Sequence, residues 1–301
     1  MTTDKQQAPK LLDMRVASFT HFLQGPAASQ YLADMGADVI KVEAPGGNYE
    51  RRWLAAGRDV GGYGSLLLAA NRNLRSIVID LKGDLGREAA LKLIENSDVV
   101  IENYRPGVMD RLGLGYEAVK VRKPDIIYAS ATGYGPDGPL SKGPGQDLLA
   151  QARAGMVAQN GEFGTRPTPI GNSGIDQHAA TLLALGIVGA FARKLTTGEG
   201  TRVDGTLYNA CVDFMQEGLV HYFSGDHDSD VLKRTRTCRA GTWRRPMAPT
   251  GSRMVPSSSP STRTRNCSGH WKIRASLRRS TSTRGGTGTA VPNCWPTCSP
   301  I

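Results

Sequence analysis

The stretch RSIVIDLKGDLGREAALKLIENSDVVIENY, from Arg75 to Tyr104, contains a complete strand–helix–strand unit. Its two ends, RSIVIDL and DVVIENY, are short runs rich in β-branched residues, which indicate strands. Between them, Leu85, Ala89 and Leu93 recur at helical spacing. Two strands joined by a single helix predict a right-handed crossover and parallel pairing. The apolar character of SIVI and VVI is typical of strands that are buried on both faces.

The same alternation continues on both sides of this unit. Strands are expected over 14–20, 38–44 and 125–135, and helices over 25–37, 63–71 and 109–122. Another helix is expected from about Ile175, where a long apolar run starts. Strands spaced by single helices predict an α/β fold with a doubly wound, mostly parallel sheet and flanking helices.

Composition and charge divide the chain at about residue 230. The chain has 301 residues, of which 39% are hydrophobic, and this is enough to bury a core. Its net charge is +10, but residues 231–301 contain 14 Lys and Arg and no acidic residue, so residues 1–230 carry a net charge of −4. We expect a polar extension over 1–10, one large Rossmann-like domain over 11–230, and a basic, low-complexity tail over 231–301.

The tail allows two interpretations. Its lack of helical or strand periodicity and its richness in Arg, Ser, Thr and Pro indicate translation of a shifted reading frame, with the shift near the codons for Asp230 to Met247. The alternative is a disordered basic arm that binds a nucleic acid or a membrane surface. Charge alone is weak support for nucleic-acid binding, so a nucleic-acid partner is not expected.

The sequence also predicts a cytoplasmic location without a membrane span. The N-terminal residues MTTDKQQAPK lack the apolar core of a signal peptide. The longest apolar run, from His178 to Ala192, is shorter than the roughly 20 residues that a membrane-spanning helix needs.

Cationic side chains follow the expected strands. Lys82 follows the third strand, and Arg105 and Arg111 follow the fourth. In open parallel sheets, ligands bind at the carboxyl ends of the strands, and Arg and Lys there suit a polyphosphate. No Gly-x-Gly-x-x-Gly follows the first strand and no Gly-Lys-Ser/Thr occurs, which argues against two common nucleotide-binding motifs. No metal site is expected.

Five motifs in order resemble the class III coenzyme A transferases, the family that includes formyl-CoA transferase and α-methylacyl-CoA racemase. The resemblance runs from about Leu11 to about Phe223. The motifs are GPAASQYLADMGADVIKVEAPGG, NRNLRSIVIDLKGDLGREAALKLI, DVVIENYRPGVMDRLGLGYEAV, IIYASATGYGPDGP and TGEGTRVDGTLYNA. Resemblance to this family implies CoA transfer between an acyl-CoA and a carboxylic acid, with CoA as substrate, no prosthetic group and a homodimer in intact members.

The resemblance also implies site residues. Asp176 falls on the family's catalytic aspartate, and Asp147 is expected to be a polar or acidic helper. The residues expected to contact CoA are Gln24, Ile79, Asp80, Leu81, Lys82, Asn103, Tyr104, Arg105 and Arg111. The resemblance implies that intact members continue with a small domain, which nothing after about Asp230 resembles, so the fold is expected to be incomplete at its C-terminus.

Asp176 stands at the start of the apolar helix, on one stripe with Ala180, Leu183 and Ile187. A carboxylate there can attack a thioester and form a covalent intermediate. The partial positive charge of the helix start is expected to keep it ionised. The alternative role is a helix cap, but Asn172 and Ser173 are expected to supply the cap. His178 is expected to be a packed or surface residue.

Racemase chemistry is the alternative within the family. In the racemases, the resemblance places a histidine before the aspartate that corresponds to Asp147, whereas this chain has Gln146. An amide cannot carry a proton between the two faces of a carbon, so transfer is favoured. Leu23 and Ala44 replace a glutamine and an arginine of the formyl-CoA transferases, which argues against a formyl donor.

Overall fold

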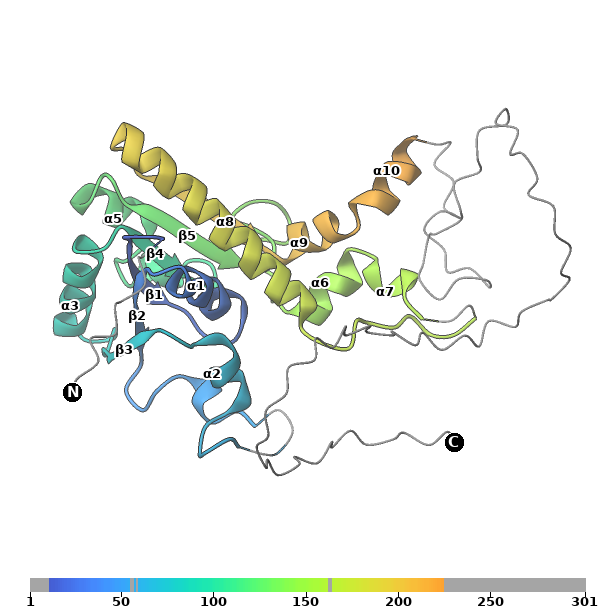
Figure 1. Cartoon of the computed structure of the whole chain (residues 1–301), viewed down its shortest axis with the longest axis horizontal. Coiled ribbons are helices and arrows are strands. Elements are labelled where there is room, and N and C mark those ends of the chain that lie inside the picture. The colour runs from blue at the N-terminus through green and yellow to red at the C-terminus, as the bar shows by residue number, and fades with distance from the viewer. Residues whose placement is uncertain (1–10, 55–56, 58, 162–163, 225–301) are drawn as a thin grey trace, which may run out of the picture. The chain divides into compact units, whose positions relative to one another are not determined.

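A parallel β-sheet organises the computed structural model, which describes residues 11–54, 57, 59–161 and 164–224. The strand order in this part of the chain is β3-β2-β1-β4-β5-β6, and all pairings are parallel (Figure 1). The strands are β1 (Arg15–Phe19), β2 (Asp38–Glu43), β3 (Arg75–Val78), β4 (Val99–Glu102), β5 (Ile127–Thr132) and β6 (Thr201–Thr206). The doubly wound α/β prediction is confirmed. The polar extension over 1–10 and the basic tail over 231–301 lie outside the described residues.

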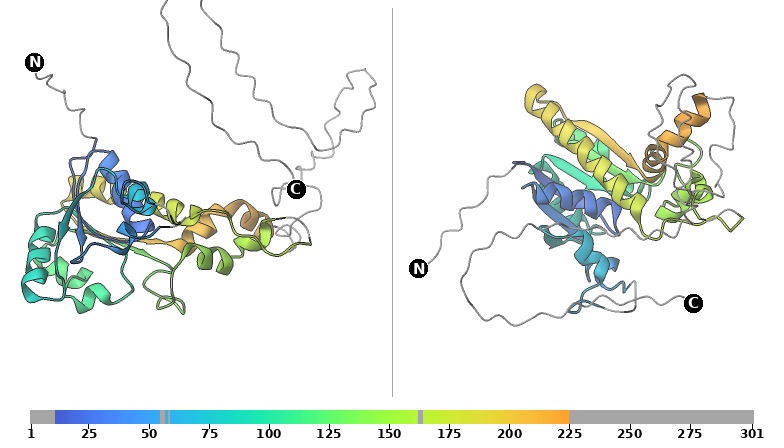
Figure 2. Two further views of the ribbon diagram at one scale, coloured as in Figure 1. Left: turned by 90° about the horizontal axis from the view of Figure 1, so that it is seen from below. Right: turned by 45° about the vertical axis from the view of Figure 1, so that its right-hand side comes forward.

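Helices cover both faces of this sheet (Figure 2). One face packs against α1 and α8, and the other against α3, α4 and α5. The helices are α1 (Gln24–Asp34), η1 (Tyr49–Arg51), α2 (Ser65–Ala70), α3 (Asp84–Glu95), α4 (Val108–Arg111), α5 (Tyr116–Arg122), α6 (Asp147–Arg153), α7 (Met156–Gln159), α8 (Gly174–Thr197), α9 (Leu207–Phe214) and α10 (Gln216–Ser224). Two apolar clusters, one on each face, therefore hold the sheet between two layers of helices.

A third apolar cluster fixes the start of α8. Ile175 and Ala179 of α8 pack there against Ala150 of α6 and against Ala210 and Cys211 of α9. All five side chains are buried. The first turn of α8 is therefore held by two neighbouring helices.

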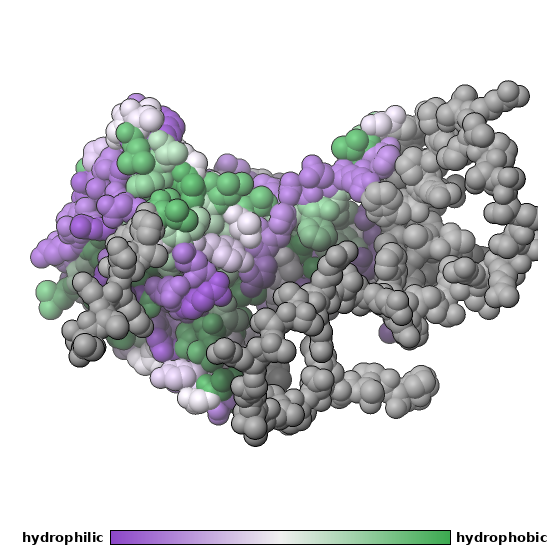
Figure 3. Space-filling view, viewed as in Figure 1, coloured by the Kyte–Doolittle hydropathy of each residue, from purple (hydrophilic) through white to green (hydrophobic). Residues whose placement is uncertain are grey.

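Helix α8 confirms the expected apolar helix. Ala180, Leu183 and Ile187 are fully buried on one stripe. The helix is long and apolar enough to cross a membrane, but it packs against α1, β5 and β6, which is the pattern of a core helix. Apolar side chains also gather on its outer side, where Leu185 and Leu195 are exposed (Figure 3).

The expected helix over 109–122 is wrong as a single element. The chain forms two short helices there, α4 and α5. Between them Gly113 has a φ of 70°, a left-handed conformation that ends α4. The helical spacing of apolar residues therefore spans both helices and does not reveal the break at Gly113.

Candidate active site

The loops after β1 and β4 meet where the strand order reverses. Asn103 Oδ1 accepts the backbone N–H of His21 (2.9 Å), and Asn103 Nδ2 donates to the His21 carbonyl (2.7 Å). Gly25, at the start of α1, packs against this link, since a Cβ there would lie 2.7 Å from Cγ2 of Thr20 and 3.1 Å from Cγ of Asn103. In doubly wound folds this crevice is the usual ligand site.

Three cations at this edge of the sheet are free of ion pairs among the described residues. They are Lys82 in the turn after β3, Arg105 after β4 and Arg111 in α4, and all three are exposed. Lys82 and Arg105 follow strands that are three strand spacings apart, about 14 Å. Their separation and free charge suit a long anionic ligand that lies across the strand ends.

The other residues expected to contact CoA differ in exposure. Asp80 is exposed and its Oδ1 accepts the Lys82 N–H (3.0 Å), while Leu81 and Tyr104 are half-buried. The side chain of Ile79 lies in the apolar core instead of at the edge. Gln24 is buried and donates to the Gly205 carbonyl at the end of β6 (3.2 Å), so its amide is already engaged.

Asp147 lies at the start of α8, although it belongs to α6. Its Oδ2 accepts the backbone N–H groups of Ile175 (2.8 Å) and Asp176 (2.9 Å). Its Oδ1 accepts from the buried amide of Gln151, whose own oxygen accepts the Ile170 N–H (3.0 Å). Asp147 therefore supplies the acceptor for two of the free N–H groups of this helix end.

The expected capping by Asn172 and Ser173 is wrong. Ser173 is the N-cap residue of α8, but its side chain makes no capping hydrogen bond. The cap comes instead from Asp147, which is far away in the sequence and is brought to α8 by packing of α6. The side chain of Asp176 is still not required as a cap.

Asp176 is a half-buried carboxyl group close to a second one. Burial, followed by the negative charge of Asp147, raises the pKa of Asp176 to about 7. Burial and the like charge therefore oppose the helix dipole, which was expected to keep Asp176 ionised. Near pH 7 the group is divided between its two protonation states.

Other titratable groups near this pair are poorly suited to chemistry. Burial, followed by the charge of Asp147, raises the pKa of the Cys211 thiol to about 12, so the thiolate is scarce at neutral pH. The His178 ring contacts Asp213 (Nε2 to Oδ2, 2.7 Å) and Phe214, as expected for a packed or surface histidine. Gln146 is exposed at the N-cap of α6.

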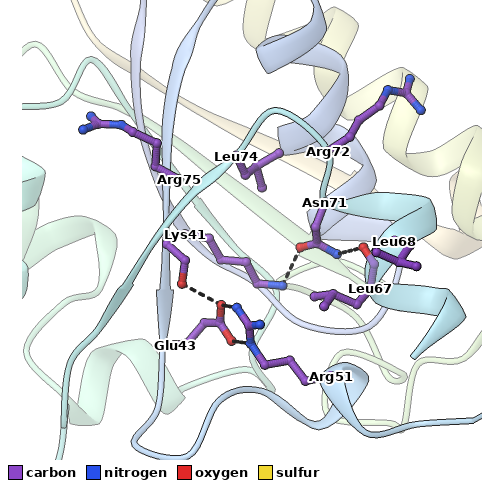
Figure 4. Close-up of a pocket in the computed structure, with 10 residues that line it drawn as sticks. Lys41, Glu43, Arg51, Leu67, Leu68, Asn71, Arg72, Leu74 and Arg75 are labelled. Atoms are coloured by element: carbon purple, nitrogen blue, oxygen red, sulfur yellow. Dashed lines mark hydrogen bonds and ion pairs between the residues drawn. The ribbon is translucent and has the colours of Figure 1, made fainter. Parts of the chain in front are cut away.

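A pocket of about 210 Å³ beside β2 and β3 is lined by several charged side chains, each of which forms an ion pair (Figure 4). Lys41 Nζ donates to Glu50 Oε1 and to Asn71 Oδ1, each at 2.6 Å. Arg51 makes two hydrogen bonds to Glu43. Although burial raises the pKa of Glu43, hydrogen bonds led by the one from Arg51 lower it to about 2. Lys41, which lies within β2, is therefore part of the fold's internal network.

Sequence reasoning missed two residues: Gln151, which hydrogen-bonds to Asp147, and Glu50, which forms an ion pair with Lys41. Each is a polar residue in an otherwise unremarkable helix, and no spacing rule singles it out. Within the described part of the chain, no group of three His, Cys, Asp or Glu side chains is placed to hold a metal ion.

Asp147→Asn tests the coupling between the two carboxyl groups. The folded pKa of Asp176, about 7, exceeds its ordinary value of about 3.9, so the stability that this group gives below pH 4 is lost as the pH rises to about 7. Removing the charge of Asp147 while keeping an acceptor oxygen should lower the pKa of Asp176. We expect a smaller fall in melting temperature between pH 4 and 7 in the variant than in the wild type. Equal falls would show that the two groups are not coupled.

Comparison with known proteins gives consistent matches. The sequence profile of CoA-transferase family III matches residues 11–244, which extends past Phe223. The chain is 40% identical over 224 residues to a succinyl-CoA:mesaconate CoA-transferase from Haloarcula hispanica, covering 72% of this chain and 56% of that protein. It is 34% identical over 243 residues to a formyl-CoA:oxalate CoA-transferase from Streptomyces avermitilis, covering 76% and 58%.

A solved structure matches as well. The crystal structure of a CAIB/BAIF family protein from Brucella suis has a TM-score of 0.68 at 34% identity, covering 71% of this chain and 57% of that one. The chain spans about half the length of the curated relatives it matches.

Proposed function

Because the chain belongs to CoA-transferase family III, we propose that it binds CoA thioesters at the carboxyl edge of its sheet and transfers CoA to a carboxylic acid through Asp176. The proposal needs no prosthetic group, because CoA is itself the substrate. It includes a cytoplasmic location and a homodimer, as the family resemblance implies. Helices α9 and α10 expose the apolar residues Phe214, Val220 and Phe223, which is consistent with a surface that the second subunit of the proposed homodimer covers.

Free cations support the binding half of the proposal. CoA carries a diphosphate and a ribose phosphate, and Arg and Lys are the side chains that bind phosphate best. Lys82, Arg105 and Arg111 are exposed at one edge and have no ion-pair partner among the described residues. The adjoining turn is fixed by Asn103, so part of the site is shaped before ligand binds.

Asp176 supports the transfer half, and its position is the observation that carries the proposal. An oxygen of Asp176 attacks the thioester carbon, the C–S bond breaks, and a mixed anhydride forms with release of CoA thiolate. The thiolate then attacks the Asp176 carbonyl carbon, which frees the first acid and leaves an aspartyl-CoA thioester. The acceptor carboxylate attacks the carbonyl carbon of this thioester, the C–S bond breaks, and a second mixed anhydride forms between Asp176 and the acceptor. The released thiolate then attacks the acceptor's carbonyl carbon, and cleavage of its C–O bond to Asp176 gives the new acyl-CoA and restores the Asp176 carboxylate.

The acids involved are proposed from the named relatives. Those relatives act on succinyl, mesaconate, formyl and oxalate groups, and we propose a small carboxylic acid as acceptor. Leu23 and Ala44 stand where formyl-CoA transferases have other residues, which favours a donor other than formyl-CoA.

The experiment that tests binding replaces Arg105 and Arg111 by alanine. Each lost charge-assisted hydrogen bond should weaken CoA binding about tenfold, and the remaining affinity should depend less on salt. Isothermal titration of the full chain with CoA measures both effects. The control is Arg122→Ala, which removes an exposed arginine that pairs with Glu95 and Glu88 on the helices. Equal weakening in the control, or no binding by the wild type, would reject this binding site.

A further inference from the structure

Strand β4 ends in a buried carboxylate, Glu102, which the proposed transfer does not use. Its side chain is only 8% exposed. In the parallel register Glu102 lies between Phe19 of β1 and Ser130 of β5. A buried carboxylate costs free energy unless hydrogen bonds compensate, so its partners indicate what it holds in place.

The partners of Glu102 belong to the turn that follows β4. Its Oε2 accepts the backbone N–H of Tyr104 (3.0 Å), and the Ser130 hydroxyl also hydrogen-bonds to it. The intervening residue, Asn103, binds both backbone groups of His21. Two successive side chains therefore fix this turn from two sides, and the exposed Arg105 follows directly after it.

We propose that Glu102 is a positioning residue for CoA, which acts by holding the backbone of residues 103–105 in the shape that the ligand meets. This inference rests on the proposed function, because it assumes that the turn contacts CoA. The role is distinct from catalysis, since Glu102 is buried behind the turn.

The ionisation of Glu102 makes the role measurable. Burial raises the pKa of Glu102 to about 7, although its hydrogen bonds and the nearby charge of Arg202 lower it. An ionised carboxylate accepts a hydrogen bond more strongly than a protonated one. Arg202 on β6 and Asp110 in α4 are the charges that act on it.

Two tyrosines close to Glu102 stay neutral in the same range of pH. Burial raises the pKa of both Tyr104 and Tyr128 above their ordinary value, so neither phenol ionises between pH 6 and 8. As the pH falls from 8 to 6, Glu102 becomes protonated and its hydrogen bond to the Tyr104 N–H should weaken. The two phenols do not contribute to this change.

The test measures the affinity of the full chain for CoA at pH 8 and pH 6. Glu102→Leu removes the acceptor and should weaken binding about tenfold at pH 8. Glu102→Gln keeps an acceptor oxygen, so binding at pH 8 should stay within about threefold of the wild type. The loss of affinity on going to pH 6 should be smaller in the glutamine variant than in the wild type.

A further variant, Ser130→Ala, keeps the inference testable if Glu102→Leu does not fold. Ser130→Ala removes a hydrogen bond that favours the ionised form of Glu102, so the change in affinity should move to higher pH. Wild-type affinity in Glu102→Leu, or an equal pH effect in Glu102→Gln and the wild type, overturns the inference but leaves the proposed function intact. A wild-type chain that binds no CoA overturns both.

Discussion

Asp176→Asn is expected to abolish the covalent attachment of CoA or an acyl group to the chain, with a loss of at least about a thousandfold in the rate of adduct formation. The amide keeps the size and most of the polarity of the side chain but lacks the nucleophilic oxygen. Incubation with an acyl-CoA, trapping with hydroxylamine and mass spectrometry of the peptide that contains residue 176 measures the adduct. The wild type should carry it and the variant should not.

The matched control for this experiment is Asp213→Asn. Asp213 is a carboxylate on the neighbouring helix α9, and it pairs with His178, two residues after Asp176. Its loss should leave the adduct on Asp176 unchanged. An adduct that persists in Asp176→Asn, or that disappears equally in Asp213→Asn, would contradict the role of Asp176. The wild-type rate should also rise with pH towards a plateau above pH 7, because the pKa of Asp176 is about 7 and only the ionised form attacks.

Lys41→Met is expected to lower the free energy of unfolding by about 3–5 kcal/mol. Lys41 and Glu50 form a buried ion pair at 2.6 Å, with exposed fractions of 2% and 0%. Glu50 Oε2 has no hydrogen-bond partner in the described residues, so removal of the ammonium leaves a buried charge with little compensation. Urea unfolding followed by circular dichroism measures the change.

The control removes both charges together. Lys41→Met combined with Glu50→Leu leaves no buried unpaired charge, so it should recover much of the stability that Lys41→Met alone loses. A double variant that is as unstable as the sum of its two single variants would show that the pair acts through packing and not through charge. The outer pair of Arg193 and Glu199, which is exposed, should contribute far less.

Most of the sheet could be predicted from sequence because strands β1, β2, β4 and β5 are largely buried. The expectation that the SIVI strand is buried on both faces is wrong, because β3 lies at the edge of the sheet and all four of its residues are exposed. The segments over 14–20, 38–44 and 125–135 are apolar, and α/β sheets need such strands where helices cover both faces. Strand β6 was not predicted. It lies at the edge of the sheet and alternates exposed Arg202 with more buried positions, so its pattern is weak. The short helices α6, α7, α9 and α10 were also not predicted.

The sequence by itself determined the fold class, the family and which charged residues follow the strands, because these depend on residue types and on their spacing along the chain. Only the tertiary structure decided which of those charges are free. Lys82, Arg105 and Arg111 are exposed and have no ion-pair partner among the described residues, whereas Lys41, within β2, forms a buried ion pair with Glu50. It also decided the chemistry of Asp176, since local rules placed the cap at Ser173 and kept the carboxylate ionised. The observed cap and the raised pKa come from Asp147, 29 residues earlier, and from burial, which are long-range effects of packing that spacing along a chain does not encode.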